Sequence, residues 1–173
     1  MYGTRNSCIA IRLAPSPISE LRQEARSIAV VTLVTRFQHW IRVFVKELTG
    51  KEPPSSVESN LKTLNEKLGK GPVPAEFFHE LETVRDSIIH ADSNVEWMRG
   101  NEQRCVPLKY REVNLEYLSK FKLTEEQLRE IRENAMAQIN LTDAHIQEAV
   151  SRSIEQAKWY EGRLTELEMS GNP

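Results

Sequence analysis

The spacing of apolar residues predicts a chain built mostly of helices. The first pattern begins at the helix-start signal Ser16-Pro17 and repeats every three or four positions until Gly50. This spacing is typical of one long amphipathic helix with an apolar stripe against a core. The residues expected in that stripe are Leu21, Ala25, Ile28, Val31, Val34, Phe37, Ile41, Phe44 and Leu48.

Two shorter helices are predicted next. Ser55-Ser56 begins a polar helix with a narrow apolar stripe, and Gly69 ends it. Pro74 opens a third helix that runs toward the turn signal Asp92-Ser93-Asn94. The buried face expected for this third helix consists of Phe77, Phe78, Leu81, Val84, Ile88 and Ile89.

The C-terminal part is predicted to hold two more helices after a non-helical excursion. Thr124 and Gln127 form a capping box that starts a helix to about residue 140, and Thr142-Asp143 starts the last long helix. Residues 95–123 contain Pro107 and alternate apolar and polar positions at 113–117, which predicts an excursion with one short hairpin.

Together these patterns predict an all-α fold, an up-and-down bundle of about five helices, with a short irregular or β-hairpin excursion near 95–123. The length of 173 residues fits one domain, 1–173, with its helical core at about 18–170.

A hydrophobic fraction of 39% and a charged fraction of 28% fit a soluble protein. The most apolar run, 28–34, is too short to span a bilayer, and no secretory signal is apparent. We therefore expect a cytoplasmic protein without a membrane partner.

Several kinds of site lack their residues in this chain. Cys8 and Cys105 are too few and too far apart for a zinc site, and we expect reduced thiols. The chain also has no Gly-rich phosphate loop, GxSxG, HExxH or CxxC motif. We expect neither a metal ion nor another cofactor. His39, His79 and His145 are expected to be partly buried core residues.

One hexapeptide, Arg85-Asp86-Ser87-Ile88-Ile89-His90, places a cation, a carboxylate and an imidazole on the third helix. Asp86 and His90 are four positions apart, so a hydrogen bond between them would orient the ring and favour its protonated form. Arg85 and His90 are separated by roughly 140° around an ideal helix. They can converge if the helix loosens near His90, or if two copies meet across a two-fold axis. The motif therefore predicts a homodimer whose partner surface includes this helix.

The hexapeptide, with an arginine, an adjacent polar residue, three further positions and a histidine, resembles the active-site motif of HEPN-domain ribonucleases. The segment Thr35–Lys46, which contains the aromatic-rich run 37–41, is similar to an early helix of these domains, although many carry an acid where this chain has Gln38. The resemblance implies an HEPN-like bundle and a metal-independent endoribonuclease that cleaves RNA by attack of the 2′-hydroxyl. His90 would be the general acid or base, Arg85 would stabilise phosphate charge, and Asp86 would orient His90.

The resemblance also implies roles in toxin-antitoxin or phage-defence systems, with an antitoxin or inhibitor protein as a partner. Two alternatives remain open at this point. The family includes non-catalytic members that serve as RNA-binding or dimerisation modules. The motif can also be a solvated helix face worth a few tenths of a kcal/mol, roughly, in a purely structural protein.

Basic residues are unevenly distributed in a chain with a net charge of −2. Residues 1–51 hold eight Lys and Arg against three acids, and residues 95–123 hold six against four. In the second segment, aromatic and basic residues alternate in a way that can stack bases and hold phosphates. The same mixture can be an aromatic edge packed on a core with snorkelling cations. The residues proposed to contact RNA are Trp97, Arg99, Arg104, Lys109, Tyr110 and Arg111.

Overall fold

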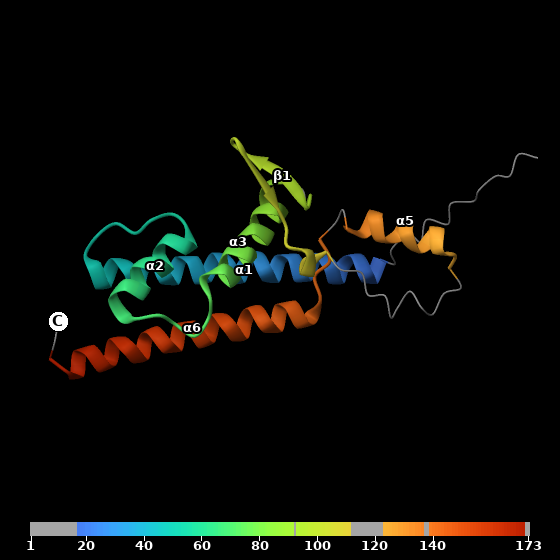
Figure 1. Ribbon diagram of the computed structural model, residues 1–173. Helices are drawn as coiled ribbons and strands as arrows, with labels where there is room; N and C mark the ends of the chain where they lie inside the picture. The colour runs from blue at the N-terminus through green and yellow to red at the C-terminus, as the bar shows by residue number, and fades with distance from the viewer. Residues whose placement is uncertain (1–16, 92, 112–122, 137–138, 172–173) are drawn as a thin grey trace, which may run out of the picture.

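The computed structural model describes residues 17–91, 93–111, 123–136 and 139–171. Within these ranges the chain is mostly helical and has one short β-hairpin, which confirms the predicted all-α class (Figure 1). The elements are α1 (Pro17–Thr49), α2 (Val57–Leu68), α3 (Ala75–His90), β1 (Glu96–Arg99), β2 (Glu102–Cys105), the 3₁₀ turn η1 (Leu108–Tyr110), α5 (Glu125–Met136) and α6 (Asp143–Met169).

Four helices share one hydrophobic core. The long helices α1 and α6 run side by side, α2 and α3 both pack on α1, and α2 contacts α6 (Figure 1). In the same view, α2 and α3 pack along α1 away from its N-terminal end. The buried residues that α1 to α3 and α6 contribute to this core are Val30, Val34, Phe37, Ile41, Phe44, Val45, Val57, Leu61, Leu64, Leu68, Phe77, Phe78, Leu81, Val84, Ala149 and Tyr160.

Three of the predicted helix starts are confirmed by capping contacts. The Ser56 side chain caps α2. Thr124 Oγ1 accepts a hydrogen bond from the Gln127 amide, and Gln127 Oε1 accepts one from the Thr124 amide. Thr142 and His145 form the same reciprocal box at the start of α6, with His145 in the place that Glu or Gln usually takes. These local signals therefore determine where three helices begin.

The N-terminal part of α1 differs from the prediction, because its apolar stripe is buried only from Val30 onward. Leu21 and Ile28 are 64% and 60% exposed. Arg26 pairs with Asp143, the first residue of α6, at 2.8 Å, so the turns of α1 before Arg26 project past the start of α6. By length and composition alone α1 could cross a membrane, but the core helix of a soluble protein meets the same criterion.

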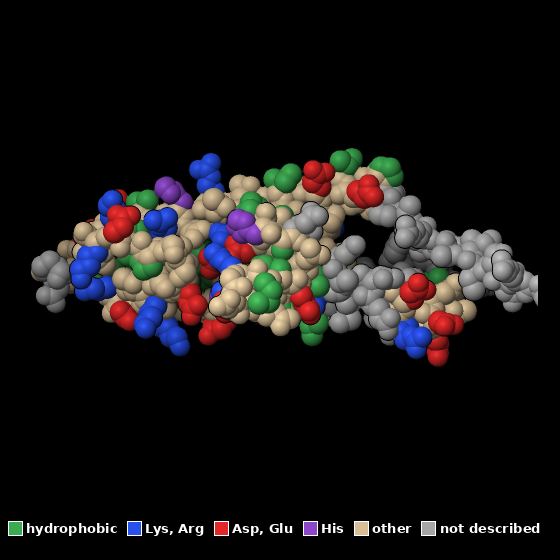
Figure 2. All heavy atoms as spheres, turned by 90° about the horizontal axis from the view of Figure 1, so that it is seen from above, with side chains coloured by type: hydrophobic (Ala, Val, Ile, Leu, Met, Phe, Trp, Pro, Cys, Tyr) green, Lys and Arg blue, Asp and Glu red, His purple; other side chains and the backbone are tan. Residues whose placement is uncertain are grey.

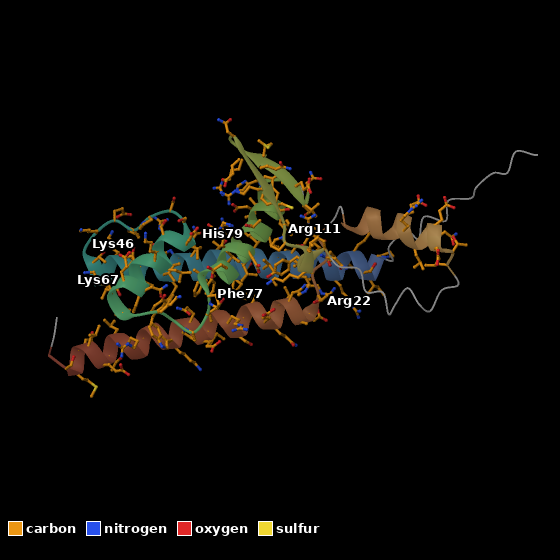
Figure 3. The ribbon with its side chains drawn as sticks, viewed as in Figure 1. Arg22, Lys46, Lys67, Phe77, His79 and Arg111 are labelled. Atoms are coloured by element: carbon orange, nitrogen blue, oxygen red, sulfur yellow. The ribbon has the colours of Figure 1, made fainter. Side chains whose placement is uncertain are left out.

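The predicted hairpin is present and lies at 96–105. Its register pairs Glu96 with Cys105 and Arg99 with Glu102, which leaves a two-residue turn at 100–101. Gly100 has a φ of 63°, as the first position of a type II′ hairpin turn requires. The alternating positions 113–117 lie outside the described residues. The hairpin projects from the helical body next to the C-terminal end of α3 (Figures 1 and 3).

Candidate active site

The hexapeptide lies on the last turns of α3, and its residues differ sharply in exposure. Asp86 and Ser87 are buried, Arg85 is half-buried at the edge of the core, and His90 is exposed. Ile89, which was expected on the buried face, is 49% exposed. Ile89 lies about 100° from Ile88 around the helix axis and therefore falls outside the stripe that faces α1.

α3 remains regular up to His90 and is then closed by a tight turn. The backbone amides of Ala91 and Ser93 both donate to the carbonyl of Ser87 at 3.0 Å, and the Ser87 hydroxyl donates to the carbonyl of Asn94 at 2.7 Å. Ser93 has a φ of 62°, a left-handed conformation that is unfavourable for a non-glycine residue. The helix therefore does not loosen before His90, and Arg85 and His90 leave it in different directions.

Arg85 is held by three neighbouring side chains. Its Nε and Nη2 donate to Asp86 Oδ1 at 3.0 and 2.5 Å, and its Nη1 donates to Gln38 Oε1 at 2.6 Å. Glu82 Oε1 lies 3.5 Å from Nη2. The Arg85 side chain is only 12% exposed as a result. Gln38, where the HEPN resemblance leads one to expect an acid, thus contacts the motif arginine directly, and its Nε2 donates to the carbonyl of Ser55 at 2.6 Å.

Asp86 contacts two arginines rather than His90. Its Oδ1 accepts from Arg85, and its Oδ2 accepts from Arg99 Nη1 of strand β1. The Asp86 side chain is 3% exposed, so both cations approach a carboxylate that water scarcely reaches. The contacts among the described residues include no hydrogen bond or ion pair of His90. The expected pairing of Asp86 with His90 is therefore not formed.

We call Glu82, Arg85, Asp86 and Arg99 the arginine–carboxylate cluster. It has two formal positive and two formal negative charges. Burial raises the pKa of Glu82 above its ordinary value, although the adjacent Arg85 guanidinium opposes that change. The cluster joins α1, α3 and the hairpin through side chains of Gln38, Arg85 and Arg99.

Three of the residues proposed to contact RNA share one face of the hairpin. Trp97 and Arg99 are two positions apart on β1, and Arg104 is the cross-strand partner of Trp97, so all three lie on the face that reaches α3. Trp97 is half-buried against the core. Arg104 pairs with Glu102 at 2.6 Å and is 25% exposed, whereas Arg99 is 56% exposed.

The other three residues are bound within the protein. Tyr110 and Arg111 are 2% and 6% exposed, so little of either side chain is accessible to RNA. Arg111 lies at the foot of the hairpin (Figure 3) and its Nε donates to the carbonyl of Val106 at 2.6 Å. Lys109 pairs with Glu80 and lies over the rings of Phe77 and Tyr110. This part of the segment follows the alternative interpretation, in which aromatic residues pack on a core beside cations.

The remaining histidines do not add to the site. His39 and His79 are exposed, contrary to the expectation of partial burial, and His145 is half-buried in its helix cap. Among the described residues, no three His, Cys, Asp or Glu side chains are grouped so as to hold a metal ion.

The face in Figure 2 mixes acidic, basic and apolar side chains and has no continuous basic groove over the described residues.

Comparison of the chain with protein-family models, with curated proteins and with solved structures found no match. The HEPN resemblance therefore rests on the hexapeptide and on the layout of the helices.

Proposed function

We propose that this protein is an endoribonuclease that cleaves RNA without a metal ion, with His90 as the proton-transfer group. The observation that carries the proposal is the position of His90 at the end of a regular helix, next to a cluster that holds two arginines. His90 is exposed there and has no partner among the residues that the structure describes. An imidazole in that position is accessible to substrate and can transfer a proton.

The proposed reaction uses the 2′-hydroxyl of the RNA as nucleophile. One imidazole removes the 2′-hydroxyl proton, the 2′-oxygen forms a bond to phosphorus, and the bond from phosphorus to the 5′-oxygen breaks. A protonated imidazole supplies the proton that the leaving 5′-oxygen takes up. The products are a 2′,3′-cyclic phosphate and a 5′-hydroxyl end, and an arginine stabilises the charge that develops on the phosphate.

A homodimer supports this chemistry better than one chain does. The reaction needs a base and an acid, and two copies of α3 related by a two-fold axis would bring one His90 each. Because α3 stays regular through His90, Arg85 and His90 of one chain do not converge. Ile89 is exposed beside His90 and offers apolar surface for such a contact. Light scattering should therefore report a dimer at micromolar concentration. A monomer with full activity would contradict the dimer.

A second candidate function is a non-catalytic RNA-binding or dimerisation module. The observation in its favour is that all three nitrogens of Arg85 are bound inside the protein, so the motif arginine acts as a structural tie. In this alternative the α3 end and the hairpin hold RNA, and His90 transfers no proton.

The deciding experiment is incubation of purified protein with mixed RNA in EDTA, followed by analysis of the product ends. We expect cleavage that leaves cyclic phosphate and 5′-hydroxyl ends. His90→Ala should lower the rate by about two orders of magnitude, the scale of losing a general acid-base group. His79→Ala is the matched control, because His79 is an exposed histidine of the same helix. Cleavage that EDTA stops, or that His90→Ala leaves unchanged, would refute the proposed site.

A further inference from the structure

The guanidinium of Arg99 has one edge bound and one edge without a partner among the described residues. Nη1 donates to the buried Asp86 carboxylate, whereas the contacts of the described residues include none made by Nε or Nη2. The side chain of Arg99 is 56% exposed and that of Asp86 is 3% exposed. The ion pair therefore fixes the inner side of the guanidinium and leaves its outer side open to solvent.

We propose that Arg99 binds the phosphate backbone of RNA at the candidate site and that Asp86 is the positioning residue that directs it. This inference rests on the proposed action on RNA. The edge formed by Nε and Nη2 presents two parallel donors, which is the arrangement that matches two phosphate oxygens. Arg85 cannot offer such an edge, because Asp86 and Gln38 already accept from all three of its nitrogens.

The burial of the carboxylates makes the exposed side of the cluster attractive to an anion. Asp86 lies behind Arg99 and Glu82 is 14% exposed, so a phosphate that approaches from solvent meets the cation first. Glu102, the cross-strand partner of Arg99, is also exposed, but its carboxylate pairs with Arg104 and not with Arg99.

The hairpin gives Arg99 a fixed position beside α3. Arg99 is the last residue of β1, and Trp97, two positions earlier on the same face, packs against the core. A two-residue turn with Gly100 in the left-handed region follows Arg99 directly and restricts the movement of the strand end. Asp86, Trp97 and the turn together hold the guanidinium next to the exposed end of the motif helix.

The test is binding of a fluorescent single-stranded 2′-O-methyl RNA, which cannot be cleaved by 2′-hydroxyl attack, measured by anisotropy over a range of salt concentrations. Arg99→Gln keeps an amide donor for Asp86 but removes the charge and the second donor. We expect Kd to rise about tenfold and the slope of log K against log salt to fall by about 0.7, the value for one phosphate contact on a single strand.

Arg104→Gln is the matched control, because Arg104 lies on the same hairpin face and is paired with Glu102. It should leave Kd within about twofold of the wild type. Equal weakening by both variants, or no weakening by Arg99→Gln, would overturn the inference. If Arg99→Gln unfolds, Arg99→Lys serves instead. The lysine should retain the salt slope and lose part of the affinity, and affinity equal to the wild type would refute the role of the planar edge.

The positioning role of Asp86 is tested by a double-mutant cycle. Because Asp86 acts through Arg99, the variant Asp86→Asn/Arg99→Gln should bind RNA no more weakly than Arg99→Gln alone. If the losses of RNA affinity in the two single variants add up in the double variant, Asp86 does not act through Arg99.

Failure of the inference and failure of the ribonuclease proposal give different results. If the wild type cleaves RNA but Arg99→Gln binds RNA as tightly as the wild type, the role of Arg99 is refuted and the ribonuclease proposal stands. If RNA binding depends on Arg99 but no RNA is cleaved, the ribonuclease proposal is refuted and the RNA-binding role of Arg99 stands. A wild-type protein that neither binds nor cleaves RNA would refute both.

Discussion

The two ends of the hexapeptide differ in almost every physical respect. Arg85 is half-buried and Asp86 is buried in the arginine–carboxylate cluster, where neighbours from α1 and the hairpin bind them, whereas His90 is exposed and ends its helix. Six adjacent residues thus divide into a part that is bound within the fold and a part that is accessible to solvent. Changes at the two ends should therefore affect stability and activity in opposite proportion.

The largest effect on stability is expected from Asp86→Ala. The change leaves Arg85 half-buried with only Glu82 and Gln38 beside it, and it frees Arg99 from the helix. Removal of one partner of a buried ion pair typically costs about 3–5 kcal/mol in the free energy of unfolding. Urea denaturation followed by circular dichroism measures this loss. A midpoint equal to that of the wild type would show that the cluster does not hold α3 and the hairpin together.

Arg85→Lys should have the next largest effect. A lysine can place its charge near Asp86 or Glu82, but it cannot at once donate to Asp86 and to Gln38 in the directions that the guanidinium does. We expect a loss of about 1.5–3 kcal/mol, the range for hydrogen bonds to charged groups. The same denaturation experiment applies, with Arg36→Lys as the control, because Arg36 is an exposed arginine of α1. An equal effect of the two changes would contradict the special role of Arg85.

Glu82→Gln should change how the free energy of unfolding depends on pH more than it changes the free energy of unfolding at any one pH. Because burial raises the pKa of Glu82 above its ordinary value of 4.5, the folded state favours the protonated carboxyl. That contribution is fully present below the ordinary pKa and is lost as the pH rises through the raised folded pKa. The neutral amide of the variant lacks this dependence, so the variant should gain stability relative to the wild type as the pH rises from about 4 to about 7. Parallel stability curves over that range would contradict the raised pKa.

His90→Ala should have the smallest effect on stability, although we expect it to have a large effect on cleavage. The exposed side chain has no hydrogen bond or ion pair among the described residues, so the free energy of unfolding should change by no more than about 0.5 kcal/mol. Thermal melts of the variant and the wild type provide the comparison. A drop of several degrees would mean that His90 supports the fold, and its loss of activity could then not be assigned to chemistry.

The sequence predicts those parts of the molecule that depend on neighbouring residues. Helix starts at Ser56, Thr124 and Thr142 follow from side chains within three or four positions of the backbone amides that they cap. The exposure of His90 likewise follows from its place at the end of an amphipathic pattern. In contrast, Leu21 and Ile28 continue the same apolar spacing but are exposed, because burial requires a partner helix that only the tertiary fold can supply.

The site contacts that the sequence did not reveal are the long-range ones. Gln38 and Arg85 are 47 positions apart, and no local pattern links them. The pairing of Asp86 with Arg99 replaced a contact with His90 that helix spacing alone favoured, because a hairpin arginine competes for the same carboxylate. The hairpin itself had a usable signal, since Gly100-Asn101 between two short extended segments is typical of a two-residue turn.

The register of the hairpin limits which insertions the chain can accept. Side chains alternate between the two faces of a strand, so one residue added between Trp97 and Met98 would turn Arg99 away from α3. Met98, which is now 61% exposed, would then point toward the Asp86 carboxylate. A two-residue insertion at that point would preserve the alternation and move Arg99 along the strand by about 6.6 Å. With the parity of the insertion, Arg99 should therefore alternate between the two faces of the hairpin, and each of these insertions should separate it from Asp86.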